Sequence, residues 1–304
     1  MWRCLARGCI GLGIWIGGLP MPGSGVVLAN AAEVGGGLAM QLRREGLPLA
    51  PGIRIRLAAA RLPPRGVVPA TAIQELAGRH RWDRFAAESR LAPVRVEIEP
   101  IELQGRRVGH QVRTAFTLRT RLDDARAGTD DVEPLELGQT DPAGSFRELS
   151  AEELARAGVT AADGSERFAQ VQLSLLNRIE VRGVIRLQRR LGGDSLEVAW
   201  AFDHRFDSLP DYRATAARFT SNELGERVRG SPEPYAGGGG IVVARQLPRD
   251  AAAGPPVVVV ESRLVFSEPE AWFGGSNLLR AKIPLITQEG VRSLRRRLEL
   301  AAAE

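Results

Sequence analysis

The chain has 304 residues, of which 41 are basic and 36 acidic, for a formal net charge of +5. This charge is small for the length, so it argues against a nucleic-acid-binding protein, and we expect no nucleic-acid partner. The length suits one large domain, or one domain with a smaller appended part.

The first 31 residues have the layout of a secretory signal peptide. Two arginines precede an apolar run from Cys9 to Leu19, and a small-x-small pattern ends at Ala31. The apolar run is short and glycine-rich for a membrane span, and a retained anchor is the alternative interpretation. We expect cleavage near Ala31 and an exported protein, either periplasmic or secreted. Both cysteines lie in this segment, so the mature chain would have no disulfide and no thiol nucleophile.

Residues 32–92 are expected to form an N-terminal arm with one helix. The stretch 32–69 is rich in glycine and proline, and its one alternating segment runs from Ile53 to Leu57. We therefore predict an extended, partly ordered arm. Residues 70–90 have apolar side chains at helical spacing, although Gly78 weakens such a helix by about 1 kcal/mol relative to alanine.

Residues 93–304 are predicted to form a domain of antiparallel strands and a C-terminal helix. From Val94 the apolar residues recur at every second position, which is typical of a strand with one dry face. The chain turns near Gly105, and a second alternating stretch follows up to Leu122, so the sequence predicts a hairpin. Residues 123–149 are acidic and are expected to form an exposed loop. Residues 150–153 then read as a capping box that starts a short helix, which Gly158 ends.

A second hairpin has the strongest strand pattern in the chain. Apolar residues alternate from Ile179 to Leu187, a Gly-Gly-Asp turn follows, and alternation resumes from Leu196 to Phe202. Gly183 occupies an apolar position of the first strand. A glycine there allows a bend, or the close approach of a ligand or another backbone.

The remaining chain is expected to contain an irregular segment, two strands and two helices. Residues 207–237 look irregular, Gly237 to Gly240 are interpreted as a flexible turn, and 241–247 and 257–266 read as strands. We predict a short helix over 271–281 and a longer one from about Pro284, because proline suits the first helical turn. The longer helix has an apolar side, which needs a partner because isolated helices are marginal in water. Burying four of its side chains on a sheet contributes about 5–8 kcal/mol.

The predicted fold class is therefore α+β, with a curved antiparallel sheet packed on a long C-terminal helix. The order of the predicted strands and helices resembles the helix-grip architecture of the START-like superfamily. So do the Lys282-Ile283-Pro284-Leu285 stretch that enters the last helix and its Leu294–Leu298 end. The resemblance covers about Val94 to Glu304. It implies an apolar cavity between sheet and helix that binds a lipid or another apolar molecule, and it carries over no catalytic residue.

Candidate ligand-binding residues are apolar positions on the expected dry faces of the sheet and helix. They are Val181, Ile185, Trp200, Phe202, Val265, Leu294 and Leu298. These residues are ordinary core unless the cavity proves open.

The densest polar cluster contains Asp203, His204 and Asp207. A histidine between two carboxylates suits a general base of a hydrolase or part of a metal site. The alternative is that these residues simply face water where a strand ends. Neither His80 nor His110 has a second histidine at helical spacing, and the mature chain has no Gly-x-Ser-x-Gly elbow. We therefore expect no metal and no cofactor, and we favour a non-enzymatic protein.

Arginines over 113–121 and 178–190 have two interpretations. They form either a basic stripe that contacts a membrane surface or an anionic polysaccharide, or a solvated sheet face that pairs with residues such as Glu97 and Glu180. Three functions remain open: an exported soluble protein that binds an apolar or lipid-like ligand, an envelope structural or interaction protein without ligand, and a hydrolase. The oligomeric state and the ligand stay unassigned.

Overall fold

The computed structural model describes residues 37–50, 52–62, 70–123, 145–161, 165–248, 256–269, 272–273 and 277–301. The expected signal peptide and most of the expected acidic loop lie outside these ranges. Within them, no helix combines the length and apolar composition that crossing a bilayer requires.

The helices are α1 (Leu38–Arg44), α2 (Ala70–Ala77), α3 (Trp82–Phe85), α5 (Ala151–Arg156), the 3-10 turn η1 (His204–Phe206) and α6 (Leu278–Ala301). The strands are β1 (Leu47–Ala50), β2 (Ile53–Ile55), β3 (Arg95–Leu103), β4 (Arg106–Arg119), β5 (Ser145–Glu148), β6 (Glu166–Leu175), β7 (Ile179–Gly192), β8 (Ser195–Phe202), β9 (Thr215–Ser221), β10 (Arg227–Arg229), β11 (Glu233–Pro234), β12 (Gly238–Gln246) and β13 (Val257–Ser267).

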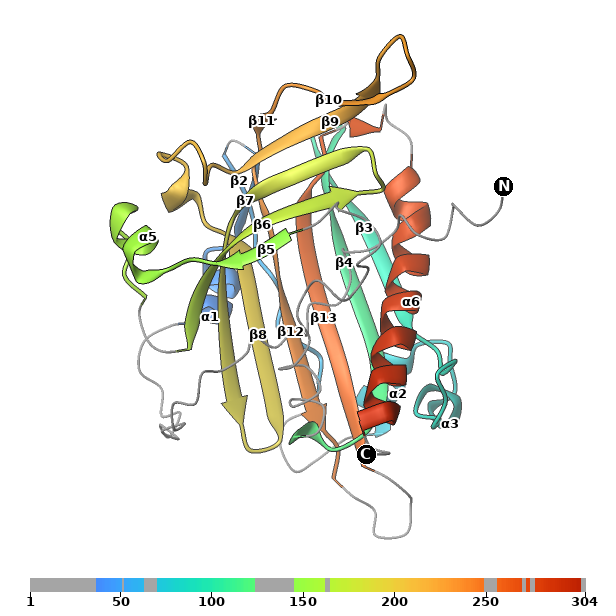
Figure 1. Ribbon diagram of the computed structural model, residues 1–304. Helices are drawn as coiled ribbons and strands as arrows, with labels where there is room; N and C mark the ends of the chain where they lie inside the picture. Colours follow the sequence, from blue (N-terminus) through green and yellow to red (C-terminus); the bar gives the residue numbers. More distant parts are fainter. Residues whose placement is uncertain are drawn as a thin grey trace.

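The fold is α+β, with one large antiparallel sheet and a long C-terminal helix, as the sequence predicted (Figure 1). The sheet has 11 strands, and its main path runs β10-β9-β7-β8-β12-β13-β4-β3. Strand β6 pairs with β7 and with β5, and β11 pairs with β9. Both expected hairpins, β3–β4 and β7–β8, are present. The expected capping box is also present, because Ser150 and Glu153 each accept from the other's backbone amide at the start of α5.

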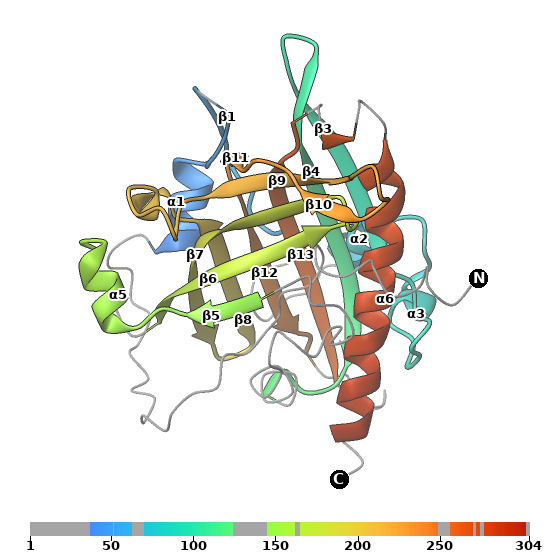
Figure 2. The same cartoon turned by 45° about the horizontal axis from the view of Figure 1, so that its top comes forward.

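Strand β7 is where the sheet folds over on itself. Its first residues pair with β9, whereas its second half, from Ile185, pairs with β8. Gly183 lies between these halves with φ of +156°. A Cβ at this position would lie 3.0 Å from the Phe202 ring and 3.1 Å from the Ala214 backbone. Gly183 therefore has both effects that its apolar position in the sequence suggested, since it allows a close approach and a bend. Strands β5, β6, β7 and β9 cross over the strands behind them (Figures 1 and 2).

Helix α6 packs on one face of the sheet, which we call the inner face. Its buried Val291, Leu294 and Leu298 belong to one apolar cluster with side chains of β4 and β13, including Phe116 and Val258. The predicted docking of this helix on the sheet is confirmed.

The two predicted C-terminal helices are a single helix. Pro284 lies inside α6 rather than at the start of a separate helix. Proline removes one backbone hydrogen bond there, but Leu279 and Ile283 before it and Val291 after it are all buried on the sheet. Packing on one continuous surface therefore overrides the local effect of the proline.

Arg295 fixes α6 to the edge of the sheet. Its side chain is buried, and its guanidinium donates to the carbonyls of Ala92 (2.6 Å) and Thr117 (2.9 Å). Burial lowers the pKa of this guanidinium to about 10, so it remains charged at neutral pH.

The opposite, outer face is covered by the N-terminal segment. Helix α1 with β1 and β2 packs against β8, β12 and β13, and α2 with α3 packs against Ala115 and Val259. The expected extended arm thus contains a helix, because Leu38, Ala39 and Leu42 form a buried stripe. The helix expected over 70–90 is divided at Gly78, which has φ of +62°.

Two segments expected to be irregular contribute strands. The 207–237 segment supplies β9, β10 and β11, and the predicted Gly237–Gly240 turn is largely the start of β12. A Cβ on Gly239 would lie 2.6 Å from the Trp200 carbonyl oxygen, and one on Gly240 would lie 2.7 Å from that of Arg263. These glycines therefore let β12 fit between its neighbours, and the flexible-turn interpretation is wrong.

Candidate functional site

A partly enclosed apolar cavity lies on the inner face, with a volume of about 60 Å³. Its lining comes from β6, β7, β8, β12, β13 and Tyr235, and no residue of α6 lines it. The cavity is therefore enclosed by the fold-over of the sheet, whereas the sequence placed it between sheet and helix. The first turns of α6 instead close one end of the surrounding cluster through Leu279 and Ile283.

Four of the seven predicted ligand-binding residues line this cavity. They are Val181, Ile185, Trp200 and Phe202. Each belongs to β7 or β8, where strict alternation in the sequence showed which side chains share a face. The structure brings them together because β7 and β8 pair as a hairpin, with Ile185 opposite Phe202.

The other three predicted residues lie elsewhere. Val265 is buried on the outer face with Leu47 and Leu49, while its neighbours Leu264 and Phe266 line the cavity. Nearly every residue of β13 is buried, so apolar and polar residues do not alternate in its sequence. The sequence therefore could not show which of its side chains point to the inner face.

Leu294 and Leu298 belong to a second inner-face cluster, between α6 and β4 and β13. Neither lines the cavity. They hold the helix on the sheet, so their position is that of core residues.

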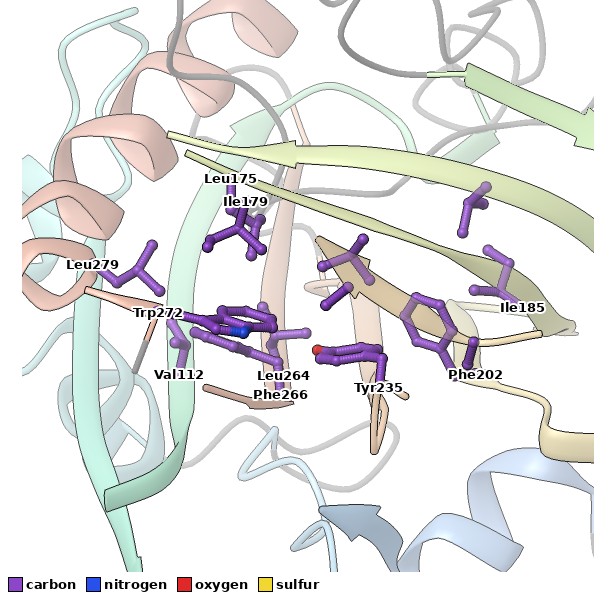
Figure 3. Close-up of a cluster of buried hydrophobic side chains, with 14 of the residues drawn as sticks. Val112, Leu175, Ile179, Ile185, Phe202, Tyr235, Leu264, Phe266, Trp272 and Leu279 are labelled. Carbon is purple, nitrogen blue, oxygen red and sulfur yellow. The ribbon is translucent and has the colours of Figure 1, made fainter. Parts of the chain in front are cut away.

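Aromatic side chains form the floor of the cavity region (Figure 3). The Tyr235 ring packs edge-on against Phe202, with centroids 5.2 Å apart, and stacks on Trp272 at 5.7 Å. The Tyr235 hydroxyl donates to the Ser267 carbonyl at 3.4 Å, and burial raises its pKa, so it stays protonated. Sequence reasoning missed Tyr235, because it lies in a segment without strand periodicity.

The polar cluster at the end of β8 forms local structural contacts. His204 Nδ1 lies 2.9 Å from Asp207 Oδ2, and its Nε2 lies 3.0 Å from the carbonyl oxygen of Ala236. Asp203 is held by the Arg205 guanidinium at 2.6 Å. Both ring nitrogens are thus engaged, and none of the three predicted residues lines the apolar cavity. This geometry leaves His204 no ring nitrogen for proton transfer to a substrate.

The strand arginines are largely paired with carboxylates. Arg113 contacts Glu261 at 2.9 Å and Glu97 at 3.4 Å, and Arg182 contacts Glu180 at 2.7 Å. Glu97 and Glu180 are the partners that the second interpretation of the arginines named, and Glu261 is an additional one. In the described part of the chain, no group of three or more His, Cys, Asp or Glu side chains converges in a way that could hold a metal.

No protein-family model and no curated protein matches the chain. Among solved structures, TTHA0849 from Thermus thermophilus is 16% identical over 63% of this chain and 95% of its own, with a TM-score of 0.30. An uncharacterised protein from Rhizobium leguminosarum is 8% identical over 68% and 98%, with a TM-score of 0.31. CalU16 from Micromonospora echinospora is 8% identical over 69% and 97%, with a TM-score of 0.24. Similarity this low carries no argument about function, and the fold class rests on the strand pairing and helix described above.

Proposed function

We propose that the chain is an exported, non-enzymatic protein of START-like helix-grip type that binds a small apolar or amphipathic molecule in the inner-face cavity. The single observation that carries this proposal is the cavity itself. It lies within the main apolar cluster, and its lining includes Val181, Trp200 and Phe202. A dry, preformed hollow of this kind favours apolar groups over water.

The volume limits what can bind. A cavity of about 60 Å³ exceeds the ~10–15 Å³ that a single water needs, but it is below the ~300–1,000 Å³ of pockets that enclose drug-sized ligands. The bound group is therefore small, or only part of a longer ligand enters while the rest extends through the opening.

Native mass spectrometry of protein purified from its producing cells tests this proposal. We expect a co-purifying small-molecule mass, and the Leu173→Trp variant should lose it, because Leu173 lines the cavity and is only half-buried. The matched control is Val228→Trp, at an exposed site away from the cavity. If wild-type protein carries no adduct and binds no added apolar probe such as Nile red, the proposal fails.

An interaction protein without ligand is the second candidate. It requires an exposed apolar patch, and the described chain does have exposed large apolar side chains. They are Met40, Leu91, Leu103, Leu224, Val228 and Leu285. Because they are spread over α1, the end of the α3 loop, two hairpins and α6, they support a single docking patch less well than the cavity supports a ligand.

A further inference from the structure

A second, more polar hollow lies where the β3–β4 hairpin meets the start of α6. Its volume is about 250 Å³, and its lining includes Arg107 and His110 of β4, Glu102 of β3, and Asn277 and Arg280 at the start of α6. We refer to it as the polar pocket. Nothing in the sequence indicated this pocket, because its lining comes from segments far apart in the chain.

A buried carboxylate fixes two of the pocket residues. Glu268 is fully buried, and its two oxygens lie 3.0 Å from Arg107 Nη2 and 2.5 Å from His110 Nε2. Nε2 is occupied by this contact, and Nδ1 is the nitrogen left for another partner. His110 is 1% exposed, and Nδ1 has no hydrogen-bond partner among the described residues. A buried polar atom of this kind gains from a ligand that satisfies it.

The pocket also gathers positive charge that is not neutralised within it. Arg280 is exposed in the first turn of α6 and forms no ion pair with any described residue, whereas Arg107 is already held by Glu268 and by Asn277 Oδ1 at 3.2 Å. The pocket lies at the N-terminus of a 24-residue helix, whose free amides and dipole favour an anion. The opposing charge in the lining is Glu102, which is exposed to solvent.

The linings of the polar pocket and the apolar cavity are in contact through two rings. Phe266 lines the cavity, and His110 is its cross-strand partner, with ring centroids 5.7 Å apart. The inner face therefore presents an apolar hollow and a hollow with cationic donors side by side. This arrangement matches a molecule with an apolar part and a charged end.

We propose that the polar pocket binds the oxyanionic head of the ligand, a carboxylate or a phosphate, while its apolar part occupies the cavity beyond Phe266. This inference rests on the proposed function and adds the chemical class of the ligand. Arg280 and the first amides of α6 bind the head, and the unpartnered Nδ1 of His110 adds a further polar contact.

Calorimetric titration with four probes tests the inference: octanoate, octyl phosphate, octanol and inorganic phosphate. Wild-type protein should bind one of the two amphipathic anions about tenfold to a hundredfold more tightly than octanol, the range expected for hydrogen bonds to a charged group. Arg280→Gln should remove most of this preference. Arg292→Gln changes a half-buried arginine of α6 that is outside the pocket, and it should keep the preference.

The four probes separate failure of this inference from failure of the proposed function. If octanol and both anions bind equally well, and Arg280→Gln does not change this, the proposed binding of an anionic head is refuted. The proposed apolar site is then unaffected. If only inorganic phosphate binds, the proposal of an amphipathic ligand is refuted. If none of the four probes binds, both proposals are refuted. His110→Gln should also weaken the preference, because it replaces the unpartnered Nδ1 in the pocket lining. An unchanged preference in a folded His110→Gln variant would remove His110 from the site.

Discussion

Replacing Gly183 with alanine tests whether the fold-over of the sheet depends on the missing side chain. A Cβ there meets the Phe202 ring at 3.0 Å and the Ala214 Cα at 3.1 Å, with φ of +156°. Overpacking costs about 1–3 kcal/mol, and an unfavourable backbone region adds about 1–3 kcal/mol. Reduced entropy of the unfolded chain offsets about 0.4–1 kcal/mol. We expect a net loss of about 2–4 kcal/mol.

Urea denaturation followed by circular dichroism measures this loss. With a slope of about 2 kcal/mol per molar urea, the unfolding midpoint should fall by about 1–2 M. The matched control is Gly193→Ala in the β7–β8 turn, where nothing lies within 4 Å of the added Cβ, so its stability should stay within about 0.5 kcal/mol of wild type. If Gly183→Ala is as stable as this control, the close approach of Phe202 does not constrain the bend.

Three further outcomes follow from burial, charge and the N-terminus. Leu294→Ala should lower the free energy of unfolding by about 2–4 kcal/mol because its side chain is buried between α6 and the sheet, whereas Leu285→Ala, at 59% exposure, should change it by less than about 0.5 kcal/mol. The pKa of Glu153 is lowered from 4.5 to about 2, mainly by the Ser150 backbone amide and then by the Tyr212 hydroxyl. This carboxylate therefore contributes stability above its unfolded pKa, and the contribution is lost as pH falls from 4.5 toward 2. The melting-temperature gap between wild type and Glu153→Gln should close over that range, and a constant gap would refute the linkage. Edman sequencing of exported protein should find a mature N-terminus near residue 32, and a chain that retains residues 1–31 would contradict the signal peptide.

Periodicity located the strands that have one dry and one wet face. The β3–β4 and β7–β8 hairpins, the capping box before α5 and the apolar side of α6 could all be predicted, because each depends on residues within a few positions of one another. For the same reason, the four cavity residues on β7 and β8 were found. Val265 was misplaced because β13 is covered on both faces, which erases the alternation that identifies an inward side chain.

The sequence alone determined an α+β chain of antiparallel strands with a terminal helix that needs an apolar surface. Only the tertiary structure decided that the sheet folds over at Gly183 to enclose the cavity, and that Glu268 meets His110 and Arg107 beside the start of α6. Local periodicity reports which face of an element is dry. Periodicity carries no information on which distant element will pack against that dry face, or on which buried charges will pair. Both depend on contacts between residues far apart in the chain. The continuous α6 shows the same limit, since packing on the sheet overrode the proline within it.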